Sequence, residues 1–331
     1  MPRPQRREKS LTRAVARFVF SCQELSIGAV LAQSTVTSTF NNFCARCGGT
    51  STPSQMGWRG TQLAGDYPSV LHRNVAAFAQ RSWTSLPKFL ASPLNAPSVE
   101  AFDDAAAWVT ERFDNEQPIV LDSGCGAGLS TYNLACTFPD AAVIGVDRSE
   151  SRVDKGEALD LPDNALIIRA ELATFWRLML EAEHGDNPVR SALAASRVSK
   201  HYVLYPNPYP KSSRLNLRWH GHAAFPALLA IGDDLEVRSN WRVYLDEFRL
   251  AASVATDAAV SSDPPTADTG LPSHRARALE WTHGRVAMRS GCEVQPLHLD
   301  DAGEAMTAFE RKFYEVREPL WRLRSSMAQG G

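Results

Sequence analysis

The chain has 331 residues, 44% of them apolar, which is enough for one large domain with a sizeable core and less ordered ends. Its formal net charge of -2 and isoelectric point near 6.5 exclude a strongly basic molecule, so a nucleic-acid partner must be held by a local patch. No run of about 18 apolar residues occurs, and we therefore expect no membrane-spanning segment and no membrane partner.

Residues 1–60 are rich in Arg, Ser and Thr and contain only two acidic residues, Glu8 and Glu24. This composition is typical of a disordered or targeting tail, although a start codon assigned too far upstream gives the same pattern. We expect a cytoplasmic protein, or one of the mitochondrion or another organelle if the tail is a transit peptide. Cys44 and Cys47 form a C-x-x-C, but no second pair stands at zinc-finger spacing, so we predict no metal site.

The domain organisation expected after this tail is an N-terminal extension at residues 61–96 and one catalytic domain at residues 97–331. Within that domain the stretch SVATDAAVSSDPPTADTGLPSHRA, residues 253–276, combines Pro, Ser, Thr and Asp without hydrophobic rhythm. This composition indicates a disordered insertion between ordered elements.

Strand and helix signals alternate through the central part of the chain. Short apolar runs typical of buried strands occur in PIVLDSG, AAVIGVD, NALIIRA and RVSKHYVLYP, at residues 118–124, 141–147, 164–170 and 197–206. Apolar residues at helical spacing follow the first run, in residues 128–138. This β-α-β rhythm predicts an α/β fold with a doubly wound, mostly parallel sheet, in which ligands bind at the strand ends.

A glycine-rich turn follows the first predicted strand. Asp122 ends the strand, and the glycines of the turn are Gly124, Gly126 and Gly128. Glycine allows positive φ and a close approach of backbone to ligand. Asp147 ends the next strand, where a carboxylate can accept from both ribose hydroxyls.

The acidic residue before the turn favours one class of cofactor. Asp122 would repel a pyrophosphate but suits the cationic end of S-adenosylmethionine, which we therefore predict. Another nucleotide cofactor, or a turn without ligand, remains an alternative. Glu171, after the third strand, is placed to read the adenine amino group, and a solvent-exposed glutamate is the alternative.

Residues 187–222 contain no acidic side chain and carry six cations among three histidines. The cations are Arg190, Arg197, Lys200, Lys211, Arg214 and Arg218. One interpretation is a patch that contacts nucleic-acid phosphates beside the cofactor pocket. The other is an ordinary solvated surface.

Five motifs in one order carry a resemblance to a known family. LDSGCGAG, GVD, YPNPYPK, RSNW and TAFERK are similar to the motifs of the bacterial-type tRNA (guanine-N7-)-methyltransferases. That family has an acid before a glycine turn, an acid ending the second strand, F-P-D-P-W-P-K, T-D-W and T-x-F-E. The resemblance covers residues 97–324 apart from residues 253–276. It implies a Rossmann-like class I methyltransferase fold, S-adenosylmethionine as cofactor and tRNA as substrate.

The resemblance also implies roles for single residues. Asp122 and Asp147 match cofactor-binding acids, Asn207 and Lys211 stand in the proline-rich catalytic segment, and three positions match substrate-side residues. These three are Asn240, Thr307 and Glu310. Thr307 and Glu310 equally fit an ordinary helix start with a capping box. From the residues themselves we add Tyr209 as a stacking ring and Arg214 as a phosphate contact.

Two departures bear on the chemistry. Asn207 stands where the family has Asp in P-D-P, and Ser239 with Asn240 stands where it has T-D. Guanine N7 has a lone pair and no proton, so it needs positioning more than a general base, and a neutral Asn should slow the reaction rather than abolish it. Two alternatives stay open: a non-catalytic S-adenosylmethionine-binding or RNA-binding subunit, and an exocyclic-amine methyltransferase that uses Asn207 and Tyr209 as its N-P-P-Y.

Overall fold

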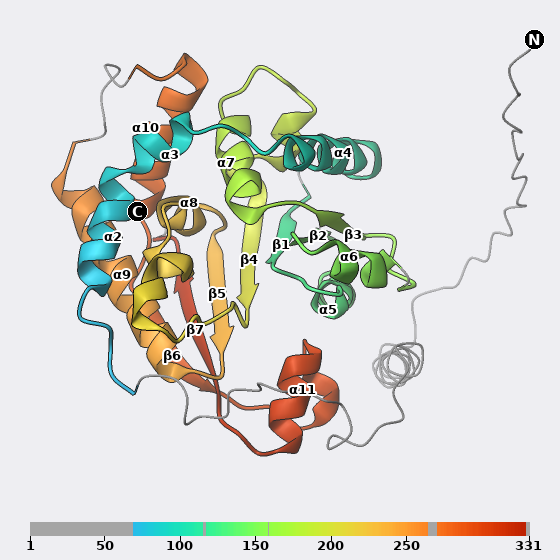
Figure 1. Cartoon of the computed structure of the whole chain (residues 1–331). Helices are drawn as coiled ribbons and strands as arrows, with labels where there is room; N and C mark the ends of the chain where they lie inside the picture. The colour runs from blue at the N-terminus through green and yellow to red at the C-terminus, as the bar shows by residue number, and fades with distance from the viewer. Residues whose placement is uncertain (1–68, 115–116, 158, 264–269, 329–331) are drawn as a thin grey trace, which may run out of the picture. The chain divides into compact units, whose positions relative to one another are not determined.

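The computed structural model describes residues 69–328 except 115–116, 158 and 264–269 (Figure 1). The predicted tail at residues 1–60, with Cys44 and Cys47, lies outside this part. Among the described residues, no helix has the length and apolar character needed to cross a membrane.

Within the described residues, seven strands form one sheet in the order β3-β2-β1-β4-β5-β7-β6. The strands are β1 (Ile119–Ser123), β2 (Ala142–Asp147), β3 (Ala165–Arg169), β4 (Val198–Leu204), β5 (Asp234–Ser239), β6 (Glu293–Leu297) and β7 (Leu320–Ser326). The first five are parallel, and β7 runs antiparallel to both β5 and β6. This order, with its reversal beside β1, is the doubly wound class I methyltransferase arrangement, and the predicted fold class is confirmed.

Helices cover both faces of the sheet, as the figure shows (Figure 1). Those that share the large core are α2 (Val75–Thr84), α3 (Leu86–Ala91), α4 (Ala96–Arg112), α7 (Leu172–Ala182), α8 (Phe225–Ala230), α9 (Arg242–Ser261) and α10 (Ser273–Ala287). The opposite face packs against α5 (Leu129–Thr137) and α6 (Glu150–Glu157), with α11 (Ala308–Glu315) near its edge. Every residue of β1 and β2 is buried because both faces are covered.

The four strands expected from apolar runs are confirmed as β1 to β4, and the helix expected after Gly128 is α5. The disordered insertion expected at residues 253–276 needs correction at both of its ends. Residues 253–261 are not disordered but form the second half of α9, where Ala255 and Ala259 pack into the core. Alanine has the highest helix propensity, and it outweighs the Ser, Thr and Asp of this stretch. Residues 273–276 likewise begin α10.

The extension expected at residues 61–96 is, in its described part, integral to the domain. Val75 and Ala79 of α2 and Leu86 and Leu90 of α3 belong to the same apolar cluster as the helices of the sheet. The helix α2 packs against α9, and α3 packs against α10. The helices α2 and α3 therefore form part of the same hydrophobic core.

Candidate functional site

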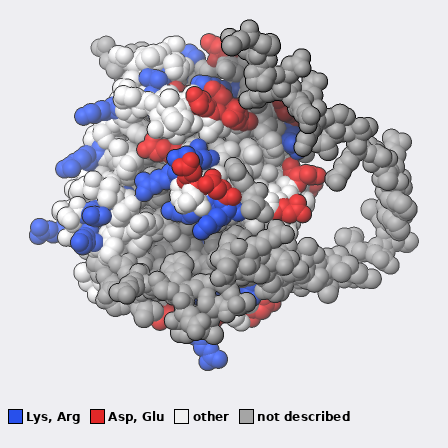
Figure 2. Space-filling view, turned by 45° about the vertical axis from the view of Figure 1, so that its right-hand side comes forward, with Lys and Arg blue, Asp and Glu red and all other residues white. Residues whose placement is uncertain are grey.

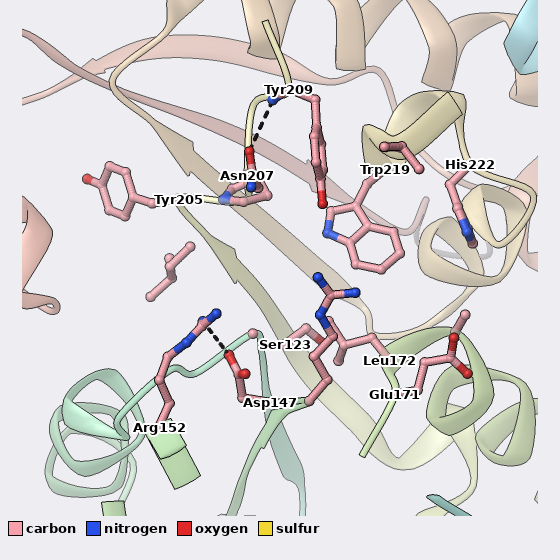
Figure 3. A pocket seen from close by; sticks show the side chains of 16 residues that line it. Ser123, Asp147, Arg152, Glu171, Leu172, Tyr205, Asn207, Tyr209, Trp219 and His222 are labelled. Carbon is pink, nitrogen blue, oxygen red and sulfur yellow. Dashed lines mark hydrogen bonds and ion pairs between the residues drawn. The ribbon is translucent and has the colours of Figure 1, made fainter. Parts of the chain in front are cut away.

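A pocket of about 270 Å³ lies at the carboxyl ends of the central parallel strands. Its lining comes from the segments that follow β1, β2, β3 and β4 and from the short 3-10 turns after β4. Figure 3 shows Asp147 and Arg152 on one side of this pocket and Asn207, Tyr209 and Trp219 on the other. The strand-order reversal therefore places segments distant in sequence around one cavity.

The glycine turn after β1 has the conformation that its sequence predicts. Gly124, Gly126 and Gly128 have φ of 86°, 61° and 80°. The backbone nitrogen of Gly124 donates to the Val146 carbonyl at 2.7 Å, which joins the turn to β2. A Cβ added to Gly124 would meet no atom within 4 Å, so this backbone faces open space at the pocket.

Asp147 ends β2 and lines the pocket, as expected. Its Oδ1 accepts from the backbone nitrogen of Ser149 at 2.8 Å. Its Oδ2 accepts from the nitrogen of Gly126 at 3.1 Å and from Nη1 of Arg152 at 3.0 Å (Figure 3). The carboxylate is thus fixed against the glycine turn, and one of its hydrogen bonds goes to an exposed, displaceable guanidinium.

Asp122 does not line the pocket, contrary to the expectation that it faces a cationic ligand. Successive strand residues point to opposite faces, and Asp122 points toward α5. Its Oδ2 accepts from the hydroxyls of Ser130 at 2.6 Å and Thr131 at 2.8 Å, whereas the buried Oδ1 has no hydrogen-bond partner among the described residues. Burial raises the pKa of this carboxyl to about 6, against the lowering effect of the two hydroxyls.

Ser123, the neighbour of Asp122, does reach the pocket. Its hydroxyl is 2.8 Å from Nε2 of His201 and accepts from Nε1 of Trp176 at 3.0 Å. Burial lowers the pKa of His201 to about 3, so this histidine is neutral. The hydroxyl therefore has a fixed orientation at the pocket floor.

Glu171 lines the pocket after β3, as expected. Its Oε2 accepts from the hydroxyl of Thr174 at 2.6 Å, and its backbone nitrogen donates to Ser98 Oγ at 2.9 Å. His222 lies across the same end of the pocket, and Figure 3 shows the two side chains near one another. Burial lowers the pKa of His222 while the charge of Glu171 opposes that shift.

The segment after β4 brings Asn207 and Tyr209 into the pocket. The amide oxygen of Asn207 accepts from the backbone nitrogen of Tyr209 at 3.2 Å (Figure 3). Tyr209 has a φ of 42°, a region that residues other than glycine seldom adopt. Trp219 lies beside it and packs edge-on against Trp176, with ring centroids 4.6 Å apart. Aromatic surface thus meets one amide group on this side of the pocket.

Most cations of residues 187–222 already have partners in the fold, so a phosphate-contacting patch in this stretch would rest on few of them. Four of its cations have partners elsewhere in the fold: Arg190 pairs with Asp103, Arg197 donates to three carbonyls, Lys200 pairs with Asp234, and Arg218 pairs with Glu247. Lys211 and Arg214 are exposed, with no ion pair among the described residues, but neither lines the pocket. Figure 2 shows basic and acidic side chains intermixed over the middle of one face.

The three residues expected on the substrate side from the later motifs lie outside the pocket lining. Thr307 caps α11 by accepting from the nitrogen of Glu310 at 3.0 Å. Glu310 is fully buried, accepts from the nitrogen of Met306 and binds Nη1 of Arg238 at 2.9 Å. Asn240 follows β5 and is half-buried. Thr307 and Glu310 therefore stand at an ordinary helix start, as the capping-box interpretation predicts.

Several pocket residues escaped the sequence interpretation, among them Ser123, Arg152, Tyr205 and His222. Strand alternation is the signal that could have identified Ser123, since Asp122 and Ser123 cannot face the same side of the sheet. Tyr205 carried no signal of its own, because its φ of 51° and its packing on Phe309 depend on distant segments.

The pocket fits S-adenosylmethionine. The open backbone at Gly124 leaves space for a ligand to approach closely, and carboxylates stand at the ends of β2 and β3 in Asp147 and Glu171. Leu172 and Ala173 supply apolar surface beside Glu171.

Comparison with known proteins agrees with these features. Residues 116–223 match a family model described as "Putative methyltransferase". The tRNA (guanine-N(7)-)-methyltransferase of Cytophaga hutchinsonii is 30% identical over 114 residues, 34% of this chain and 45% of that protein. The protein of the same name from Bacteroides fragilis is 33% identical over 102 residues, 30% of this chain and 40% of that protein. The chain thus spans less than half the length of these relatives.

Solved structures with similar folds include a 16S rRNA (adenine(1408)-N(1))-methyltransferase from Catenulisporales acidiphilia. It is 18% identical, covers 72% of this chain and 93% of its own, and has a TM-score of 0.36. The 16S rRNA methyltransferase KamB is 20% identical, covers 67% and 91%, and has a TM-score of 0.36.

The match to the family model includes the glycine turn, Asp147, Glu171 and the Asn207 segment, all within residues 116–223. The family resemblance of the motifs is thereby confirmed as a similarity: residues 116–223 match the methyltransferase model, and the chain is similar to tRNA (guanine-N7-)-methyltransferases over 34% and 30% of its length in these two comparisons.

Proposed function

We propose that this protein transfers a methyl group from S-adenosylmethionine to N7 of guanine in tRNA. One observation carries the proposal: a single pocket joins Gly124 and Asp147 of the cofactor half to Asn207 and Tyr209 of the substrate half. The names of the sequence relatives support the substrate.

Asp147 and Glu171 hold the cofactor in this proposal. Asp147 accepts from the ribose hydroxyls after releasing Arg152, and Glu171 lies at the adenine end. The backbone at Gly124 accommodates the amino-acid portion. Bound S-adenosylmethionine supplies an electrophilic methyl group on a positively charged sulfur.

The substrate half positions the purine and needs no general base, because N7 carries a lone pair and no proton. Tyr209 and Trp219 offer ring surfaces for stacking on a base. Asn207 fixes the turn that carries Tyr209 and presents its amide to the ring edge. Alignment of N7 with the methyl group is then the main contribution to rate.

Contacts to tRNA outside the pocket rest on few charges. Lys211 and Arg214 are exposed on the segment that follows Tyr209. Their ammonium and guanidinium groups suit phosphate oxygens and fix register without reading sequence. With four of the six cations of this stretch engaged elsewhere, RNA affinity should depend only modestly on salt concentration.

The test is methyl transfer from radiolabelled S-adenosylmethionine to bulk tRNA that lacks modifications, with nucleoside analysis of the product. N7-methylguanosine at a catalytic rate supports the proposal. A methylated exocyclic amine would favour the N-P-P-Y-like alternative. Cofactor binding without transfer to any base would favour a non-catalytic subunit.

A further inference from the structure

A fully buried ion pair lies behind the segment that carries Tyr209. Nη1 of Arg218 contacts Oε2 of Glu247, and both side chains are 1% exposed. Neither residue lines the pocket. Moving two charges out of water costs several kcal/mol per ion, so such a pair needs further partners to be tolerated.

The remaining donors of Arg218 reach the backbone of the pocket segment. Its Nε and Nη2 donate to the carbonyl of Tyr209 at 3.2 and 3.1 Å, and Nη2 also approaches the carbonyl of Pro210 at 3.4 Å. The planar guanidinium can make these bonds together because its donors form a rigid fork. Arg218 therefore bridges a core carboxylate and the turn.

Tyr209 is consequently held at both ends. Its nitrogen donates to the amide oxygen of Asn207, and its carbonyl accepts from Arg218. Its φ of 42° is costly for a tyrosine and persists only where neighbouring contacts determine it. The hydrogen bonds to Asn207 and Arg218 are contacts that determine this φ.

Glu247 in turn is anchored by the core. It lies on α9, and its Oε2 is 3.1 Å from Nε2 of His220. Its Oε1 accepts from the backbone nitrogen of His72 at 2.8 Å, at the chain entry to α2. The carboxylate thus has partners on both oxygens, and one of them precedes α2.

We propose that Arg218, held by Glu247, is a positioning residue that fixes the ring of Tyr209 at the substrate side of the pocket. Its catalytic consequence rests on the proposed function, whereas the fixation of the segment does not. Loss of the fork frees residues 205–210 and misaligns the purine. The cofactor half is unaffected, because the Asp147 side of the pocket shares none of these contacts.

Arg177 provides a matched control. It is equally buried, pairs with Glu181, and donates to the carbonyls of Phe89 and Ser92, away from the pocket. Arg177→Lys removes a guanidinium fork from the core just as Arg218→Lys does. The two variants should therefore lose similar stability. They differ in the segment that the guanidinium binds, which is the Tyr209 turn for Arg218 and the end of α3 for Arg177.

The experiment compares Arg218→Lys and Arg177→Lys in the full chain. For Arg218→Lys we expect kcat on tRNA to fall roughly tenfold or more, with the Kd for S-adenosylmethionine unchanged and faster deuterium uptake in residues 205–210. Arg177→Lys should leave kcat and that uptake near the wild-type values. Equal kcat in the two variants, or unchanged uptake in Arg218→Lys, would overturn the proposal.

Glu247→Gln serves as a second variant if Arg218→Lys does not fold, and it should give the same change in uptake. If the wild type transfers no methyl group to tRNA, the proposed function fails. Deuterium uptake in residues 205–210 still decides the role of Arg218 in that case.

Discussion

The amide oxygen of Asn207 and the backbone nitrogen of Tyr209 are 3.2 Å apart and form a hydrogen bond. One lone pair of this oxygen is therefore engaged within the turn, and the second lone pair and the NH₂ of Asn207 are left for a ligand. The exocyclic-amine alternative would have to use that second lone pair to accept from the substrate amine.

Replacing Asn207 by Asp should accelerate guanine-N7 methylation. One carboxylate oxygen keeps the bond to Tyr209, and the other brings a negative charge next to the purine that becomes positive. A charged hydrogen bond exceeds a neutral one by about 1 kcal/mol, which corresponds to roughly a fivefold rise in kcat/KM. Asn216→Asp, an exposed change of equal charge outside the pocket, is the control. A slower Asn207→Asp enzyme would count against the guanine-N7 proposal.

Asp147→Asn should weaken cofactor binding with little effect on RNA binding. The amide loses the charge that favours ribose hydroxyls, and we expect Kd for S-adenosylmethionine to rise roughly tenfold, the equivalent of about 1.4 kcal/mol. Calorimetric titration measures it. Asp154→Asn, on the exposed side of α6, should bind as the wild type does. Equal affinity in both variants would remove Asp147 from the cofactor site.

Asp122 should make the stability of the fold depend on pH. Its pKa rises from 3.8 to about 6 on folding because of burial, so the folded chain holds this proton more tightly than the unfolded chain. The stabilisation is present below the unfolded pKa and is lost as the pH rises through 6. Between these two pKa values, rising pH lowers the free energy of unfolding of the wild type but not that of Asp122→Asn. The free energy of unfolding of the variant relative to the wild type should therefore rise by something on the order of 3 kcal/mol.

Urea unfolding at several pH values measures this difference, with exposed Asp140→Asn as the control. A difference between Asp122→Asn and wild type that stays constant from pH 4 to 7 would mean that Asp122 titrates normally.

Gly128→Ala should destabilise the protein more than Gly126→Ala. Both positions have positive φ, which costs an alanine about 1 kcal/mol. A Cβ at Gly128 would also lie 2.1 Å from Cδ1 of Ile167, whereas one at Gly126 meets nothing closer than 3.9 Å. Overpacking adds about 2 kcal/mol. Adding Ile167→Val removes Cδ1, so thermal unfolding of the double variant should show this extra loss relieved.

The sheet and the glycine turn were predictable because their signals are local. Buried parallel strands appear as continuous apolar runs, and three glycines at alternate positions indicate positive φ. The second half of α9 was not predictable from local composition, because its Ser, Thr and Asp residues are typical of disorder while its alanines favour a helix. Its burial depends on α2, which lies far away in sequence.

The pairing of four cations in the basic stretch was not predictable for a related reason. Whether a cation faces solvent depends on partners that sequence proximity does not reveal. Asp103 for Arg190, Asp234 for Lys200 and Glu247 for Arg218 come from other helices and strands. The orientation of Asp122, by contrast, was predictable from the sequence. Successive strand residues point to opposite faces, so Asp122 and Ser123 cannot both face the pocket.

The packing of α2 and α3 on α9 and α10 sets a limit on truncation. The family resemblance begins at residue 97, yet a polypeptide cut there would uncover the apolar surface that Val75, Leu86 and Leu90 now bury. It would also remove the His72 nitrogen from a carboxylate that has no access to water. Such a fragment should aggregate rather than fold, so the smallest autonomous unit of this protein starts well ahead of its recognisable motifs.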